Sequence, residues 1–143
     1  MSEGRSGSYA FFDHTADVGI RATGATFEAL LTALAQALVA LLVEDSVLEP
    51  RTSRAVQLTA LDETALLIAW LQQVLFWFST DRFLPCSFAF DTATPTALRG
   101  TVTGDRFDPA RHVQGREVKA ITRHLLEVAR RDGQWHAQMI VDI

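Results

Sequence analysis

The stretch VGIRATGATFEALLTALAQALVALL, residues 18–42, changes its hydrophobic period partway along and so decides which kind of fold to expect. Its first five residues follow a period of two, as a half-buried strand does. Apolar residues then recur every three or four positions, which is typical of an amphipathic helix. Thr26 can cap this helix, and Glu28 in its first turn faces the positive end of the helix dipole. We therefore expect a strand followed directly by a helix.

The rest of the chain extends this pattern. A second strand is predicted at residues 55–60, and Asp62 can cap a second helix with an apolar stripe. Further strands are predicted at residues 87–91, 97–103, 118–124, 125–129 and 135–141. Asp132-Gly133 predicts a hairpin turn before the last of them, because both residues tolerate positive φ. The order predicts an α+β fold in two layers, with two helices packed on one face of a largely antiparallel sheet.

The length and composition favour one cytoplasmic domain. The chain has 143 residues and a single cysteine, Cys86, which has no internal partner for a disulfide. Residues 1–8 are rich in Gly and Ser and predict a loose tail, so the domain is expected at residues 9–143. There is no basic and apolar leader, and the apolar-rich stretch at residues 27–43 is too short and too polar to span a membrane.

Charge and missing motifs narrow the functional classes. The net charge is −4, from 17 acidic and 13 basic residues, which disfavours strong binding to nucleic acid by the chain alone. The sequence contains no phosphate-binding glycine loop and no CxxC, HExxH or GxSxG motif. We therefore expect a protein that is not an enzyme and that acts on RNA, if at all, through another protein.

Two acidic segments are candidates for a metal site. His14 and Asp17 precede the first predicted strand, whereas Asp142 and Ile143 end the sequence. We expect Asp17, Asp142 and the Ile143 carboxylate to meet and bind one hard divalent cation, Ca²⁺ or Mg²⁺. Clustered carboxylates repel one another unless a proton or a cation intervenes, and oxygen donors suit these ions. The alternative is that each aspartate caps its own turn and the terminus is solvated.

Taken together, several motifs resemble those of the archease family, from about Phe11 to Ile143. The motifs are His14-Thr15-Ala16-Asp17-Val18-Gly19-Ile20, Glu117-Val118-Lys119-Ala120-Ile121-Thr122 followed by His124, Gly104-Asp105 with the downstream His112, and the final Asp142-Ile143. The sequence departs from the family pattern at three positions. Arg123 stands where many members have Tyr, and Asp13 and Asp105 stand where Glu is common.

The resemblance implies a fold of one sheet with two helices and an inserted strand-rich lobe, which we place at about residues 83–115. It also implies an accessory function, the activation of an RtcB-type RNA ligase in tRNA splicing and RNA repair. Such proteins promote guanylylation of the ligase and its repeated turnover. The alternative is a general chaperone or adaptor for tRNA-modifying enzymes, including a tRNA methyltransferase.

The resemblance also changes how residues 116–124 are interpreted. Their alternation alone predicts a strand with a solvated polar face. As part of the resemblance, Lys119 and Glu117 are expected to form the functional surface together with His14. His14 is expected to orient its loop rather than bind the ion, because imidazole is a poor calcium ligand. A metal-dependent hydrolase is disfavoured, since no nucleophile and base lie beside the acids.

Overall fold

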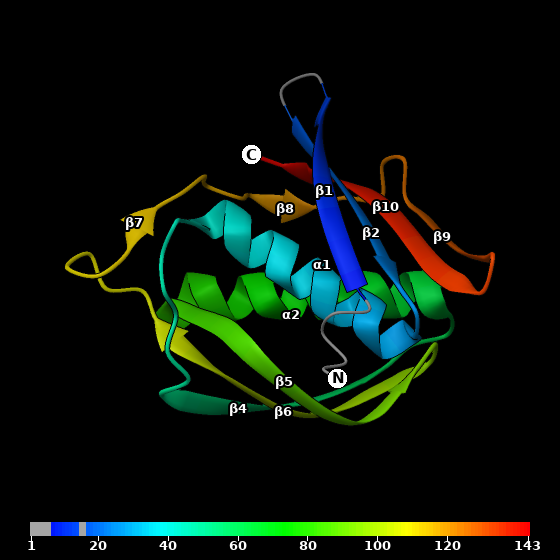
Figure 1. Ribbon diagram of the computed structural model, residues 1–143, viewed down its shortest axis with the longest axis horizontal. Coiled ribbons are helices and arrows are strands. Elements are labelled where there is room, and N and C mark those ends of the chain that lie inside the picture. Colours follow the sequence, from blue (N-terminus) through cyan, green and yellow to red (C-terminus); the bar gives the residue numbers. More distant parts are fainter. Residues whose placement is uncertain (1–6, 15–16) are drawn as a thin grey trace.

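The structure, a computed structural model, describes residues 7–14 and 17–143 (Figure 1). The helices are α1 (Phe27–Leu42) and α2 (Glu63–Asp81). The strands are β1 (Gly7–His14), β2 (Asp17–Gly24), β3 (Val43–Glu44), β4 (Thr52–Thr59), β5 (Phe83–Thr94), β6 (Ala97–Arg106), β7 (Val113–Gln114), β8 (Ala120–Ile121), β9 (Glu127–Arg131) and β10 (Gln134–Asp142). A loose tail was expected at residues 1–8. Residues 1–6 lie outside the described part of the chain, and Gly7 and Ser8 belong to β1.

Both helices begin at the predicted caps. The Thr26 hydroxyl accepts a hydrogen bond from the Ala29 N–H at 3.0 Å, and the Asp62 carboxylate accepts one from the Ala65 N–H at 2.8 Å. These bonds satisfy amides that have no partner within the first helical turn. Helix α2 ends at Arg82, whose φ of 63° lies in the left-handed region that closes many helices.

The strands form antiparallel sheets around the helix pair. A five-stranded sheet has the order β1-β2-β10-β8, with β9 also paired to β10, and a three-stranded sheet has the order β4-β6-β5. Strands β3 and β7 form a separate pair. The predicted α+β class is confirmed. Figure 1 adds that the three-stranded sheet covers the side of the helices opposite the five-stranded sheet, and both helices contact both sheets.

The two helices differ in how deeply they are buried. Twelve of the sixteen residues of α1 are buried, against eight of the nineteen in α2. The fully buried Trp70 of α2 donates its indole N–H to the Leu31 carbonyl oxygen of α1 at 2.9 Å, which satisfies both groups in the core. Helix α1 is therefore the centre of the core, whereas α2 keeps one face open to solvent.

The predicted strand at residues 118–124 is shorter in the structure, where only β8 remains. The Thr122 hydroxyl donates to the Ile140 carbonyl oxygen at 2.7 Å and accepts from the His124 N–H at 3.2 Å. Leu125 follows with a φ of 56°. The bond from His124 to Thr122 is local and replaces a ladder bond, so the chain turns before β9. Strand β1 was not predicted. Across residues 7–14 and 17–143, no helix is both long and apolar enough to cross a membrane.

Candidate functional site

The first acid of the candidate metal site, Asp17, begins β2, an interior strand of the five-stranded sheet. The strand pairs with β1 on one side, where His14 lies opposite Asp17 at the end of the hairpin. Residues 15 and 16, and the side chain of His14, lie outside the described residues, so the predicted role of His14 stays a prediction. The hairpin places Asp17 at one end of the five-stranded sheet.

Strand β10 brings the second acid to the same place. It pairs with β2 in an antiparallel register that sets Asp142 directly opposite Asp17. Directly opposed residues in such a pair project their side chains on the same face, with Cβ atoms about 4.5–5.5 Å apart. Both residues are half-buried. The structure therefore brings Asp17 and Asp142 together, as expected, although they lie near opposite ends of the sequence.

A glycine and an aromatic ring shape the sheet next to this pair. Gly19 lies opposite Phe12 on β1 and Ile140 on β10. A Cβ atom at Gly19 would lie only 2.1 Å from the Phe12 ring, so the ring lies across the backbone of β2. The Arg21 guanidinium lies over the same Phe12 ring, 4.2 Å from its centroid. The Gly19 of the first motif is thus needed for close packing beside the acids.

The segment of residues 116–124, called the Lys119 segment, contacts the acidic pair of Asp17 and Asp142 through a main-chain hydrogen bond. The Lys119 N–H donates to the Asp142 carbonyl oxygen at 2.7 Å, and Ala120 of β8 lies opposite Asp142 in the register. The side chains of Lys119 and Glu117 are exposed. Residues from the first, the second and the last motif therefore meet at one end of the sheet, although the sequence separates them widely.

The candidate donors at this end of the sheet are all oxygens, the ligand type that hard cations prefer. Asp17 and Asp142 offer carboxylate oxygens, and Ile143 adds main-chain oxygens next to Asp142. Two carboxylates opposed across a ladder repel each other, and a divalent cation relieves that repulsion. Ca²⁺ takes six to eight oxygens, so further donors must complete its shell. Among the described residues there is no group of three or more Asp, Glu, His or Cys side chains able to hold a metal ion.

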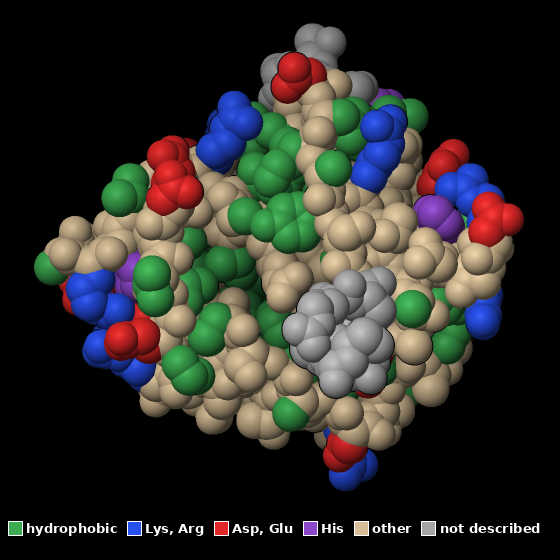
Figure 2. All heavy atoms as spheres, viewed as in Figure 1, with side chains coloured by type: hydrophobic (Ala, Val, Ile, Leu, Met, Phe, Trp, Pro, Cys, Tyr) green, Lys and Arg blue, Asp and Glu red, His purple; other side chains and the backbone are tan. Residues whose placement is uncertain are grey.

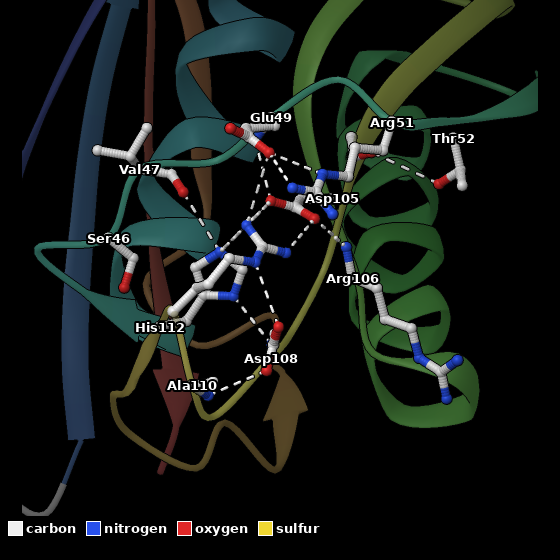
Figure 3. Close-up of polar contacts among 12 residues, drawn as sticks. Ser46, Val47, Glu49, Arg51, Thr52, Asp105, Arg106, Asp108, Ala110 and His112 are labelled. Atoms are coloured by element: carbon white, nitrogen blue, oxygen red, sulfur yellow. Dashed lines mark hydrogen bonds and ion pairs between the residues drawn. The ribbon is translucent and has the colours of Figure 1, made fainter.

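A second acidic cluster lies elsewhere, where β6 ends (Figure 3). The Asp105 carboxylate, 1% exposed, accepts two hydrogen bonds of 2.9 Å from the Arg111 guanidinium. It also accepts backbone N–H groups, from Glu49 at 3.0 Å and Arg106 at 2.8 Å. The paired guanidinium bonds, together with the backbone amides, hold the pKa of Asp105 well below its usual range. This carboxylate is therefore ionised and fully hydrogen-bonded.

His112 belongs to the same cluster. Its Nδ1 accepts the Asp108 N–H at 2.9 Å, so Nε2 carries the hydrogen and donates to the Val47 carbonyl oxygen at 3.2 Å. Nε2 also lies 3.4 Å from Asp105. These bonds join the end of β6, the turn after it and the loop before β4. The Gly104-Asp105 and His112 motif thus holds these segments together structurally. Sequence analysis did not single out Arg111, which completes the cluster.

Grooves also lie on the surface of the described part of the chain. One, of about 470 Å³, lies between α1, the loop after it and the start of β5, and includes Glu44, Asp45 and Cys86. Figure 2 shows hydrophobic side chains gathered in a hollow on the face in view. Burial raises the pKa of the Cys86 thiol. Another, of about 350 Å³, lies between α2 and residues 118–121.

The fold and this site define a class: a small α+β protein whose terminal strand sets one acid against another beside an exposed lysine. The sequence model described as Archease protein family (MTH1598/TM1083) matches residues 9–143, so the chain belongs to the archease family. It is similar to protein archease of Pyrococcus furiosus, with 33% identity over 92% of this chain and 96% of the relative. For protein archease of Methanopyrus kandleri the identity is 34%, over 92% and 96%.

Solved structures agree with this assignment. The solution structure of protein 1598 of Methanobacterium thermoautotrophicum has a TM-score of 0.79 and 32% identity, and the match covers 94% of this chain and 98% of that one. The crystal structure of an "archease, possible chaperone (TM1083)" from Thermotoga maritima has a TM-score of 0.68 and 19% identity, over 92% and 94%. The second likeness concerns the fold alone.

Proposed function

We propose that the chain is an accessory protein that activates an RtcB-type RNA ligase, promoting its guanylylation and repeated turnover in tRNA splicing and RNA repair. The observation that carries the proposal is the register of β2 and β10, which sets Asp17 against Asp142 beside Lys119. In a member of the archease family, three separate motifs thus contribute to one end of one sheet. In this proposal the catalytic step belongs to the ligase.

A divalent cation is part of the proposal. Asp17, Asp142 and the oxygens of Ile143 hold the ion, which is Ca²⁺ or Mg²⁺ because all the donors are oxygens. An incomplete protein shell leaves coordination positions that water or a group of the ligase can fill. The ion thereby offers positive charge at the surface where the partner binds.

Lys119 is the second part of the proposed surface. Its exposed ammonium lies on the segment bonded to Asp142, where it can reach a phosphate or a carboxylate of the partner. Glu117 is exposed on the same segment, two residues earlier. Because Lys119 lies outside the core, its substitution tests the surface and leaves the fold intact.

The test is single-turnover guanylylation of the cognate ligase with and without this protein. Wild-type protein should accelerate guanylylation, and Asp142→Asn should remove the acceleration. Asp91→Asn is a matched control, because Asp91 is an exposed aspartate on β5, away from the site. Equal acceleration by wild type and Asp142→Asn would overturn the role of the acidic pair. GTP hydrolysis by the isolated chain, lost in Asp142→Asn, would overturn the accessory role.

A chaperone or adaptor for tRNA-modifying enzymes is the second candidate, favoured by the description of the Thermotoga maritima protein as a possible chaperone. A chaperone would suppress aggregation of a tRNA methyltransferase without needing the acidic pair. Protection that is equal for wild type and Asp142→Asn, with no effect on the ligase, would favour this second function.

A further inference from the structure

Helix α2 has an exposed face without charge. From Thr64 to Thr80 the helix contains no Asp, Glu, Lys or Arg, although α2 keeps one face in solvent. Gln72, Phe76 and Ser79 are exposed at spacings of four and three residues, so they lie on one face. Solvated helix faces ordinarily carry charged residues, and depletion of charge around an exposed aromatic is typical of the centre of a protein interface.

Phe76 is the prominent side chain of this face. It is 59% exposed and lines the groove of about 350 Å³ that separates α2 from the Lys119 segment. Leu75, Val118 and Ile121 also line the groove, and Val118 and Ile121 are at most 9% exposed. The groove therefore has apolar walls and an aromatic ring at its edge, into which a partner's apolar side chain can pack.

The charged residues of the segment that lines the groove are mainly basic. Lys119 is the only charged residue among those that line it. Arg116 and Arg123 are exposed on the same segment, against the single acid Glu117. This local excess of basic residues contrasts with the net charge of −4 of the whole chain. The opposite holds for the groove beside α1, whose charged lining residues are Glu44 and Asp45.

We propose that the groove between α2 and residues 118–121, with Phe76 at its edge, docks an acidic amphipathic segment of a protein partner. The partner's apolar side chain packs against Phe76 and Leu75, and its carboxylates face Lys119 and the neighbouring arginines. The proposal rests on the proposed function in one respect, since the partner tested is the ligase. RNA is disfavoured as the occupant, because phosphates gain little from apolar walls and the chain is acidic overall.

The first experiment needs no partner protein. The probe is 8-anilinonaphthalene-1-sulfonate, a small aromatic anion that matches an apolar groove with a basic rim. The wild type should bind it, and Phe76→Ser should bind it roughly tenfold more weakly. The matched control is Leu61→Ser, since Leu61 is 96% exposed and lies outside the groove. Equal binding by wild type and Phe76→Ser would overturn the proposal.

A charge pair at Gln72 tests the sign of the occupant. Gln72 is exposed within the groove, so both Gln72→Glu and Gln72→Lys keep the fold. For an acidic occupant, Gln72→Glu weakens binding of the cognate ligase and Gln72→Lys strengthens it, as measured by isothermal titration. The reverse order would overturn the proposal. Phe76→Ser should weaken binding of the ligase roughly tenfold, while calcium binding stays as in the wild type.

The remaining outcomes separate this proposal from the proposed function. If the ligase does not bind the wild type, the proposed function fails, and the probe and its Phe76→Ser loss still decide the groove. If Phe76→Ser leaves ligase binding unchanged while Asp142→Asn abolishes activation, the groove proposal fails alone. Dimerisation of the wild type that Phe76→Ser removes would assign the groove to a second copy and overturn it. Salt-dependent binding of single-stranded RNA, lost in Phe76→Ser, would also overturn it.

Discussion

The two acidic clusters use the same residue type in opposite ways. Asp105 is buried and carries a bidentate guanidinium and two backbone amides, so its charge is balanced within the fold. Asp17 and Asp142 are half-buried at a sheet end, where the register sets one carboxylate against another. A charge balanced inside the fold stabilises it, whereas two carboxylates set opposite each other at a sheet end are oxygen ligands that a divalent cation prefers. The first cluster holds the fold together and the second is the candidate for function.

The largest effect on stability is expected from removing the Arg111 guanidinium, which pairs with Asp105 in the buried cluster. Arg111→Ala leaves the Asp105 carboxylate buried without its guanidinium, and should lower the free energy of unfolding more than the other substitutions proposed below, because an unpaired buried charge is strongly destabilising. Urea denaturation measures this loss. Arg99→Ala is the control, because its contact with Asp91 is exposed and long, at 3.9 Å, and should cost no more than about 0.5 kcal/mol. Similar losses in both variants would remove the distinction between the clusters.

Calcium should stabilise the protein through the second cluster. At a free concentration one hundred times the Kd, binding to the folded state adds about 2.7 kcal/mol to the free energy of unfolding. Asp17→Asn and Asp142→Asn should lose this increment, because each replaces a carboxylate ligand of the ion with a neutral amide. Thermal denaturation with and without Ca²⁺ and Mg²⁺ provides the measurement.

Two further variants locate the donors of that site. A glycine added after Ile143 moves the terminal carboxylate and should weaken binding of the divalent cation. Asp91→Asn, on the other sheet, should bind the ion as the wild type does. Equal binding by all variants, or none by the wild type, would rule out the site.

Acid should weaken the buried cluster over a defined range of pH. The folded pKa of Asp105 is lowered, so the unfolded state binds the proton first as the pH falls. The contribution of Asp105 to stability is thus complete above its unfolded pKa of about 3.9 and is lost below it, by up to about 1.4 kcal/mol for each pH unit. Urea denaturation between pH 7 and pH 3 should show a steeper decline for the wild type than for Asp105→Asn. Parallel curves would contradict the assignment.

The smallest effect on stability is expected at Lys119. Lys119→Ala replaces an exposed side chain and should change the free energy of unfolding by no more than about 0.5 kcal/mol. It should nevertheless reduce acceleration of ligase guanylylation, because the ammonium lies at the proposed surface. Circular dichroism confirms the fold, and the single-turnover assay reports the function. Full acceleration by a folded Lys119→Ala protein would refute its role.

Local patterns predicted much of the secondary structure. The caps at Thr26 and Asp62 are present, and Asp132-Gly133 turns with φ values of 53° and 75°. The predicted strand at residues 135–141 is also present, within β10 (Gln134–Asp142). These features depend on residues within a few positions of one another, so the sequence alone specifies them.

The resemblance to the archease family pointed to the residues of the candidate site. Which of these residues lie next to one another was decided by the folded structure. The expected meeting of Asp17 and Asp142 depends on the register of β2 and β10 across almost the whole chain. Analysis of local sequence patterns missed β1. It also missed Arg111, because the residues next to an arginine in the sequence do not show which buried carboxylate it will contact after folding.

The sequence by itself determined the two helices, the last hairpin, the α+β class and the two acidic segments that contain Asp17 and Asp142. Only the tertiary structure decided that a second sheet covers the helices, that Asp105 is balanced by Arg111, and that α2 leaves Phe76 beside Lys119 in an open groove. The physical reason is the range of the interactions. Helical periods, caps and turns are set by neighbours along the chain, whereas strand register and charge balance depend on groups that meet only after the chain has folded.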